Sequence, residues 1–170
     1  ETMTDLYEVK GAVLAVKENS ELPVMVSMTF EDNERTFTGV SLEAMAMTLE
    51  GLGVDAIGIN CSLGPVEILP MAKELRELTS VAVFAKPNAG LPDPETGKYD
   101  ITCSQFIETM KEYMQAGINM VGGCCGTTPA FIAELKQHAM TGTMVAKKIP
   151  SCVCTPTKCV TMDGVRVIGE

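Results

Sequence analysis

The feature that most constrains the fold is a repeat of about 30 residues, in which a short apolar run precedes an amphipathic stretch with helical spacing. This alternation is typical of parallel βα units. The repeat predicts strands at 24–30, 56–60, 81–85 and 118–121, and helices at 5–18, 41–49, 65–78, 104–116 and 128–138. Four units amount to half of a (β/α)8 TIM-type barrel, since a complete barrel needs roughly 250 residues. An open doubly wound sheet has the same order of elements and remains an alternative.

The last part of the chain breaks this repeat. From Lys147 onward the sequence is typical of a linker, and it ends in an apolar, β-like run at 165–168. The chain opens on Glu1 rather than on an initiator methionine and stops directly after that run, so we expect both ends to be cut through structured segments. We predict a partial barrel at 1–145, followed at 146–170 by a linker and the start of a next domain.

Composition excludes several classes of function. A net charge of -9 argues against nucleic acid as a partner, because such binding relies on clustered lysine and arginine. No apolar run approaches the roughly 18 residues of a membrane span, and no targeting segment is visible. Seven cysteines are an odd number for a disulfide framework. We therefore expect a cytoplasmic protein with reduced thiols that is neither membrane-bound nor bound to nucleic acid.

Three of the cysteines come shortly after predicted strands. Cys61 follows the strand at 56–60, and Cys124 and Cys125 follow the strand at 118–121. In a parallel barrel these positions share the C-terminal rim, where such enzymes place their sites. Flanking glycines give the vicinal pair the backbone freedom to face one ion. Three thiolates with one open position predict a catalytic zinc site, in which the metal deprotonates a substrate thiol and no catalytic side-chain base is needed.

Other arrangements of these side chains remain open. Cys103 is the candidate fourth ligand of a closed, structural zinc site, although it lies at the start of a helix and away from the rim pattern. The spacing of Cys152, Cys154 and Cys159 matches no common zinc pattern, so packed or exposed thiols are the simpler interpretation. His138, the only histidine, falls at the end of a helix, where a cation is favourable, and a ligand role is not expected.

Three motifs carry a resemblance to a known family. They are GINCSLGP at 58–65, KPNAGLP at 86–92 and VGGCCGTTP at 121–129. With them the chain resembles the homocysteine S-methyltransferase family over nearly its whole length. The resemblance implies the C-terminal half of a (β/α)8 barrel, because the first three strands and most of the fourth are missing. It also implies that homocysteine is the substrate and that its sulfur becomes the fourth zinc ligand during turnover.

The resemblance assigns further residues to the site. It implies that Cys61, Cys124 and Cys125 are the zinc ligands and that Asn88, in the PNAG motif, fills the fourth position when substrate is absent. Glu1 matches an acidic residue that holds the substrate amino group, a role that suits a carboxylate. Asn60, the last residue of its strand, is predicted as a second substrate-binding residue.

Within the family, the chain most resembles the homocysteine-binding module of cobalamin-dependent methionine synthases, because VRVIGE at 165–170 resembles the start of their folate-binding barrel. This implies methyl transfer from methyltetrahydrofolate through cobalamin to homocysteine in an intact parent, with those cofactors bound by modules outside this chain. Enzymes using betaine or S-methylmethionine, and a non-catalytic zinc module, remain alternatives. A half-barrel exposes sheet edges and an apolar inner face, so we also expect self-association.

Overall fold

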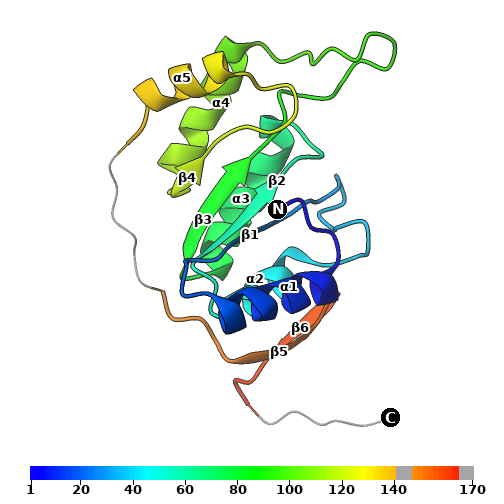
Figure 1. Ribbon diagram of the computed structural model, residues 1–170, viewed down its shortest axis with the longest axis vertical. Helices are drawn as coiled ribbons and strands as arrows, with labels where there is room; N and C mark the ends of the chain where they lie inside the picture. Colours follow the sequence, from blue (N-terminus) through cyan, green and yellow to red (C-terminus); the bar gives the residue numbers. More distant parts are fainter. Residues whose placement is uncertain (141–146, 165–170) are drawn as a thin grey trace.

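The computed structural model describes residues 1–140 and 147–164. Its first part contains four parallel strands and five helices in the predicted order (Figure 1). The strands are β1 (Met25–Met28), β2 (Ala56–Asn60), β3 (Ala82–Lys86) and β4 (Met120–Val121). The helices are α1 (Leu6–Asn19), α2 (Leu42–Gly51), α3 (Pro65–Leu78), α4 (Cys103–Gln115) and α5 (Pro129–Gln137). The repeat therefore predicted every one of these elements, to within a few residues at each end.

The sheet has the strand order β1-β2-β3-β4, and every neighbouring pair is parallel. Met3 forms a further parallel bridge with Met28, so the first residues of the chain run along the outer edge of β1. Asn60 at the end of β2 pairs with Lys86 at the end of β3, and Ala85 pairs with Val121 of β4. This register brings the residues that follow the three strands to one edge of the sheet.

Side-chain caps define where several helices begin. Asp5 accepts hydrogen bonds from the backbone at the start of α1, and Ser41 accepts one from Ala44 at the start of α2. Thr102 and Gln105 form a reciprocal capping box at α4. Each cap contributes about 1 kcal/mol to its helix. Thr128 is the N-cap residue of α5, but its side chain makes no capping hydrogen bond, and Pro129 occupies the first helical position.

The main core lies between the sheet and its helices. Alternate residues of β2 and β3 face α2, α3 and α4, and all of β2 is buried. The largest fully buried apolar side chains of this layer include Met45, Leu49, Ile57, Ile59, Ile68, Leu75, Phe106 and Met110. Truncating one of the larger aliphatic side chains to alanine would cost about 2–5 kcal/mol. This layer fixes the positions of the strand ends.

The opposite face of the sheet is concave and partly open. Met25 of β1, Phe84 and Lys86 of β3, and Met120 of β4 line one hollow of about 140 Å³, although β2 lies between β1 and β3. The Phe84 ring fills the space over Gly58, where a Cβ atom would come within 2.5 Å of the ring. Met25 is 51% exposed and Met120 38% exposed. The sheet is thus strongly curved, with apolar side chains left on its concave side.

Residues 152–161 form a feature that the sequence did not predict. They make an antiparallel hairpin of β5 (Cys152–Thr155) and β6 (Lys158–Thr161), which lies against α2 (Figure 1). Cys154 and Cys159 face each other across it and form a disulfide, so the expectation of seven reduced thiols was wrong for this pair. The pairing arises because the two-residue turn puts these cysteines in register. The apolar run at 165–168 lies outside the described residues.

No helix within residues 1–140 and 147–164 combines the length and the apolar character that crossing a bilayer requires.

Candidate metal centre

Cys61 is held at the sheet edge by an unusual backbone. It follows β2 directly, and both Cys61 and Ser62 have left-handed φ angles, 64° and 61°. The Cys61 amide donates to the carbonyl of Lys86 at 3.1 Å, which ties the turn to the end of β3. Non-glycine residues in this region are uncommon and concentrate at functional sites. The left-handed pair of residues turns the chain sharply away from the sheet before α3 begins.

The vicinal cysteines are fixed by backbone hydrogen bonds to the segment after β3. Cys124 N donates to the carbonyl of Pro87 at 2.9 Å, and the carbonyl of Cys125 accepts from Ala89 N at 2.8 Å. Gly123 passes so close to Thr127 that a Cβ atom would come within 2.5 Å of its side chain. The loop after β4 is therefore bound to the loop after β3, which places both cysteines beside the end of β2.

These turns bring three sulfur atoms together from distant parts of the sequence. The Sγ atoms of Cys61, Cys124 and Cys125 all lie within 4.8 Å of one another. Cys61 Sγ and Cys125 Sγ are 3.7 Å apart. Thiolates are soft ligands, and sulfur atoms clustered at this spacing can hold a thiophilic metal ion. The sequence prediction that these three cysteines converge on one rim is confirmed.

Burial shifts the ionisation of one of these thiols. Desolvation, together with the smaller effects of the neighbouring Cys125 and Cys124, raises the pKa of Cys61 to about 11. Without a cation, Cys61 therefore remains a neutral thiol at pH 7. A metal ion that binds here must displace that proton.

Asn60 lies beneath the sulfur atoms rather than in open space. It is fully buried, and its Nδ2 donates to Thr2 Oγ1 at 2.8 Å and lies 3.8 Å from Cys124 Sγ. Its Oδ1 accepts from Thr2 N at 3.0 Å. The amide is therefore already engaged by the first residues of the chain and by one sulfur. This arrangement suits a residue that orients Cys124.

Asn88 lies beside the vicinal pair. It is 4% exposed, its backbone N–H donates to the carbonyl of Leu63 at 3.0 Å, and its Oδ1 accepts from Cys125 N at 3.0 Å. The side-chain oxygen thus points at the backbone of one of the three cysteines. Asn88 therefore supports the loop after β4, which carries Cys124 and Cys125.

Glu1 is near the same rim and carries a full negative charge at neutral pH. It forms an ion pair with Lys86, and the hydrogen bond from Lys86 is the main reason that the pKa of the Glu1 carboxyl is lowered. Lys86 also lies over the Phe84 ring on the concave face, with Nζ 5.8 Å from the ring centroid. A carboxylate and an ammonium therefore meet at the mouth of the concave side.

Tyr99 is a site residue that sequence reasoning missed. It comes from the segment between β3 and α4, and its ring lies against Gly126, where a Cβ atom would be 2.3 Å from Tyr99 Cγ. Gly126 has a φ of +79°, so glycine is needed there for two reasons. Partial desolvation, followed by the charge and hydrogen bonding of Cys125, raises the pKa of the Tyr99 hydroxyl. The only sequence signal was a tyrosine close after the KPNAGLP motif.

Two other residues considered from the sequence lie outside the cluster. Cys103 is the first residue of α4, and it is not in the three-sulfur group found among the described residues. His138 follows α5, and its Nε2 lies 3.5 Å from Glu134 Oε1 on the same helix. In the described part of the chain, neither residue belongs to the rim cluster of Cys61, Cys124 and Cys125.

Comparison with known proteins places this geometry in a family. The sequence model described as "Homocysteine S-methyltransferase" matches residues 1–139. The chain belongs to the homocysteine S-methyltransferase family. Among curated members, the methionine synthases of Mycobacterium tuberculosis and Mycobacterium leprae are each 34% identical over an alignment of 143 positions that covers 79% of this chain. The match spans only 12% of the length of those two proteins.

Solved structures of the family have a similar fold. The apo form of the homocysteine methyltransferase MmuM from Escherichia coli superposes with a TM-score of 0.67 at 27% identity, covering 82% of this chain and 48% of MmuM. The metallated form of MmuM superposes with a TM-score of 0.68, and the matched region is 43% of that chain. The α/β architecture with a parallel sheet is therefore that of homocysteine methyltransferases.

Proposed function

We propose that the three sulfurs bind a zinc ion and that this site holds homocysteine for methylation of its thiol, giving methionine. The observation that carries the proposal is the sulfur spacing. Zinc–thiolate bonds of about 2.3 Å in a tetrahedron place sulfur atoms about 3.8 Å apart. Cys61 Sγ and Cys125 Sγ are 3.7 Å apart, and Cys124 Sγ completes the group. The three thiols would lose their protons on binding this ion.

The ligand set also suits catalysis rather than structure. Three cysteines leave one tetrahedral position, and Cys103 is not in the group that would close it. Zinc bound here would favour the thiolate form of a substrate thiol at neutral pH. No catalytic side-chain base is then required of the chain. We propose Asn88, which lies beside Cys125, for the fourth position when homocysteine is absent.

The remaining residues at the rim would orient the homocysteine substrate. Glu1 stays ionised at neutral pH and can accept the substrate ammonium, which would then take the place of Lys86. Asn60 was predicted to bind substrate directly, but its amide is buried and engaged by Thr2. We therefore propose that Asn60 serves the substrate through Cys124, whose sulfur it contacts.

We further propose that residues 1–145 form part of a closed (β/α)8 barrel, and that 146–170 lead into a next domain. The curved sheet and its partly exposed concave face support this, since a closed barrel would cover that face. The chain also covers less than half of MmuM, at 48% and 43%. The other half-barrel would be its first partner.

The methionine synthase relatives favour a parent enzyme that uses cobalamin and methyltetrahydrofolate, carried by modules outside this chain. A corrinoid-independent methyltransferase that uses betaine or S-methylmethionine is the second candidate, and the likeness to the homocysteine methyltransferase MmuM supports the same methyl acceptor for it. The coding sequence around the chain distinguishes the two, since only the first predicts folate and cobalamin modules downstream.

The zinc assignment is tested by replacing Cys124 with alanine. Cys124→Ala removes one of three sulfurs, and we expect loss of most bound zinc and of zinc-dependent homocysteine binding, measured by metal analysis and by calorimetry. Cys103→Ala is the matched control, since it removes a cysteine outside the cluster and should leave both unchanged. Equal zinc content in the two variants would refute the assignment.

A further inference from the structure

A second group of sulfur atoms lies on the hairpin, outside the metal centre. Cys154 and Cys159 are directly opposed in the β5–β6 register, with Cα atoms 4.2 Å apart, and they form a disulfide. Cys152 is two residues before Cys154 on the same strand, so its side chain lies on the same face of the hairpin. Its Sγ is 3.6 Å from Cys154 Sγ. A free thiol is therefore in contact with one sulfur of a disulfide.

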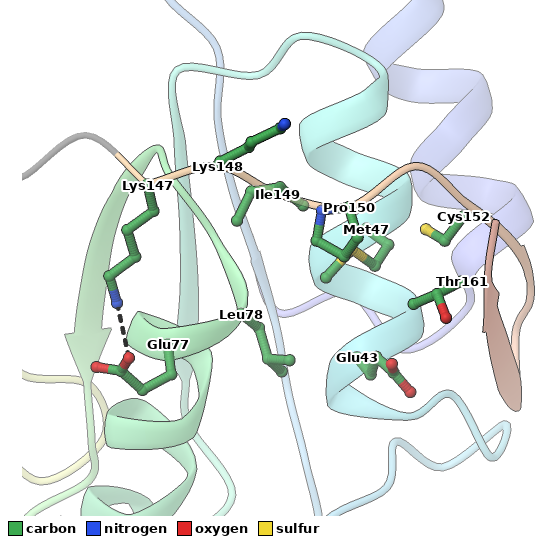
Figure 2. Close-up of a pocket in the computed structure, with 10 residues that line it drawn as sticks. All are labelled: Glu43, Met47, Glu77, Leu78, Lys147, Lys148, Ile149, Pro150, Cys152 and Thr161. Carbon is green, nitrogen blue, oxygen red and sulfur yellow. Dashed lines mark ion pairs between the residues drawn. The ribbon is translucent and has the colours of Figure 1, made fainter. Parts of the chain in front are cut away.

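Cys152 also borders a pocket through which small reactants can approach. The pocket has a volume of about 420 Å³ and lies between α2, the end of α3 and residues 147–150. Figure 2 shows Cys152 at its hairpin side, with Met47 of α2 and Leu78 of α3 on the other walls. Residues 147–150 form one side of the pocket, and Lys147 anchors them to α3 through an ion pair of 3.0 Å with Glu77. The thiol is only partly buried and thus remains accessible.

We propose that Cys152, Cys154 and Cys159 form a thiol–disulfide exchange site, in which Cys152 opens the Cys154–Cys159 disulfide. The Cys152 thiolate, after losing its proton to solvent, attacks Cys154 Sγ. The Cys152–Cys154 bond forms as the Cys154–Cys159 bond breaks, and Cys159 leaves as a thiolate that takes up a proton. The exchange needs no external oxidant or reductant because the number of disulfides does not change.

The two bonded states restrain the hairpin differently. The Cys154–Cys159 bond closes the turn, whose Pro156 carbonyl accepts from Ser41 N at 2.9 Å, at the N-terminus of α2. A Cys152–Cys154 bond lies within one strand and leaves the turn without a covalent clamp. Burial and then Glu43 raise the pKa of Cys152, which keeps it a thiol at neutral pH. The structure contains the clamped hairpin with Cys152 free, and this is the resting state of the proposed exchange.

Trypsin distinguishes the two states, because it cleaves after Lys148 and Lys158. Cys152 and Cys154 fall in peptide 149–158, whereas Cys159 begins the next peptide. The whole chain, purified without reductant and alkylated before digestion, should give the two peptides linked through Cys154–Cys159, with Cys152 alkylated. Cys159→Ser, treated with glutathione disulfide, should give peptide 149–158 closed by a Cys152–Cys154 bond, lighter by two hydrogen atoms.

Two controls keep the test decisive. Cys152→Ser should retain the linked peptides, and Cys154→Ser should leave Cys152 and Cys159 both alkylated. The proposal is overturned if all three cysteines are alkylated in the unreduced wild-type chain, or if Cys152 and Cys154 stay fully alkylated in oxidised Cys159→Ser. It is equally overturned if the reduced chain binds a zinc ion whose binding Cys154→Ser abolishes, since the hairpin cluster would then be a metal site. None of these outcomes depends on the function of the rim cysteines.

Discussion

At the scale of single residues, the sulfur cluster depends on neighbours that are not ligands themselves. Asn60 links the first residues of the chain to Cys124, and Tyr99 lies against Gly126 beside Cys125. Partners of this kind orient metal ligands, and replacing them typically weakens metal binding. Their positions depend on the parallel register, which brings three strand ends to one edge.

Replacing Asn60 tests this dependence. Asn60→Ala leaves Thr2 N without its acceptor and removes the N–H near Cys124 Sγ. We expect zinc affinity to fall by about 10–100-fold, measured by competition with a chromogenic chelator. Asn119→Ala is the control, since Asn119 also accepts from a strand backbone, at Val83 N, but it precedes β4, whereas the vicinal cysteines follow that strand. The account fails if both variants bind zinc as the unaltered chain does.

The sequence predicted some of these residues and not others. Cys61, Cys124 and Cys125 could be found because they follow apolar runs, and parallel strand ends share an edge. The left-handed turn at Cys61 and Ser62 could not be predicted, because neither residue favours that conformation. Tyr99 was missed because its contact with Gly126 arises from a long loop, and no periodic pattern encodes where such a loop folds back.

At the scale of elements, the loop after β4 is constrained by glycine. Gly126→Ala would place a side chain at a φ of +79° and within 2.3 Å of Tyr99 Cγ. We expect a loss of about 1–3 kcal/mol in the free energy of unfolding, measured by urea denaturation. Gly11→Ala is the matched control, because its Cβ would meet nothing within 4 Å in α1. It should stabilise the chain by about 0.5–1 kcal/mol, and an equal loss in both variants would contradict the account.

The periodicity of apolar residues was sufficient to predict the βα units, but it was not sufficient to predict the β5–β6 hairpin. Ser41 and Pro65 mark helix starts by their own chemistry, so the first residues of α2 and α3 were predicted within one residue. The hairpin has short strands around Pro156 and Thr157, without the glycine or asparagine that signals most tight turns. It forms because one of its faces packs on α2, a tertiary contact that a local pattern does not contain.

At the scale of the whole molecule, the concave face of the sheet has no cover among the described residues. Met25 and Met120 are exposed there, on the two outer strands. We expect the isolated chain to associate, with a mass by light scattering above 18.2 kDa that rises with concentration. Met25→Lys should reduce this association, because it puts a charge on the concave face.

Leu22→Lys is the control for that experiment. Leu22 is 73% exposed but lies in the turn before β1, so its replacement should leave the association unchanged. A monodisperse monomer at every concentration would show that the concave face does not mediate association.

The sequence indicated an uncovered sheet face, because four βα units are too few to close a barrel. It could not show the curvature of the sheet, which depends on packing across β2.

The central claim is that three cysteines hold zinc with one position open to a substrate thiol. Zinc K-edge X-ray absorption on the zinc-loaded chain, with and without homocysteine, tests it most directly. We predict three sulfur ligands and one oxygen or nitrogen ligand without homocysteine, and four sulfur ligands at about 2.3 Å with it. Sulfur coordination that does not change when homocysteine is added, or fewer than three sulfurs in the absence of substrate, would contradict the account.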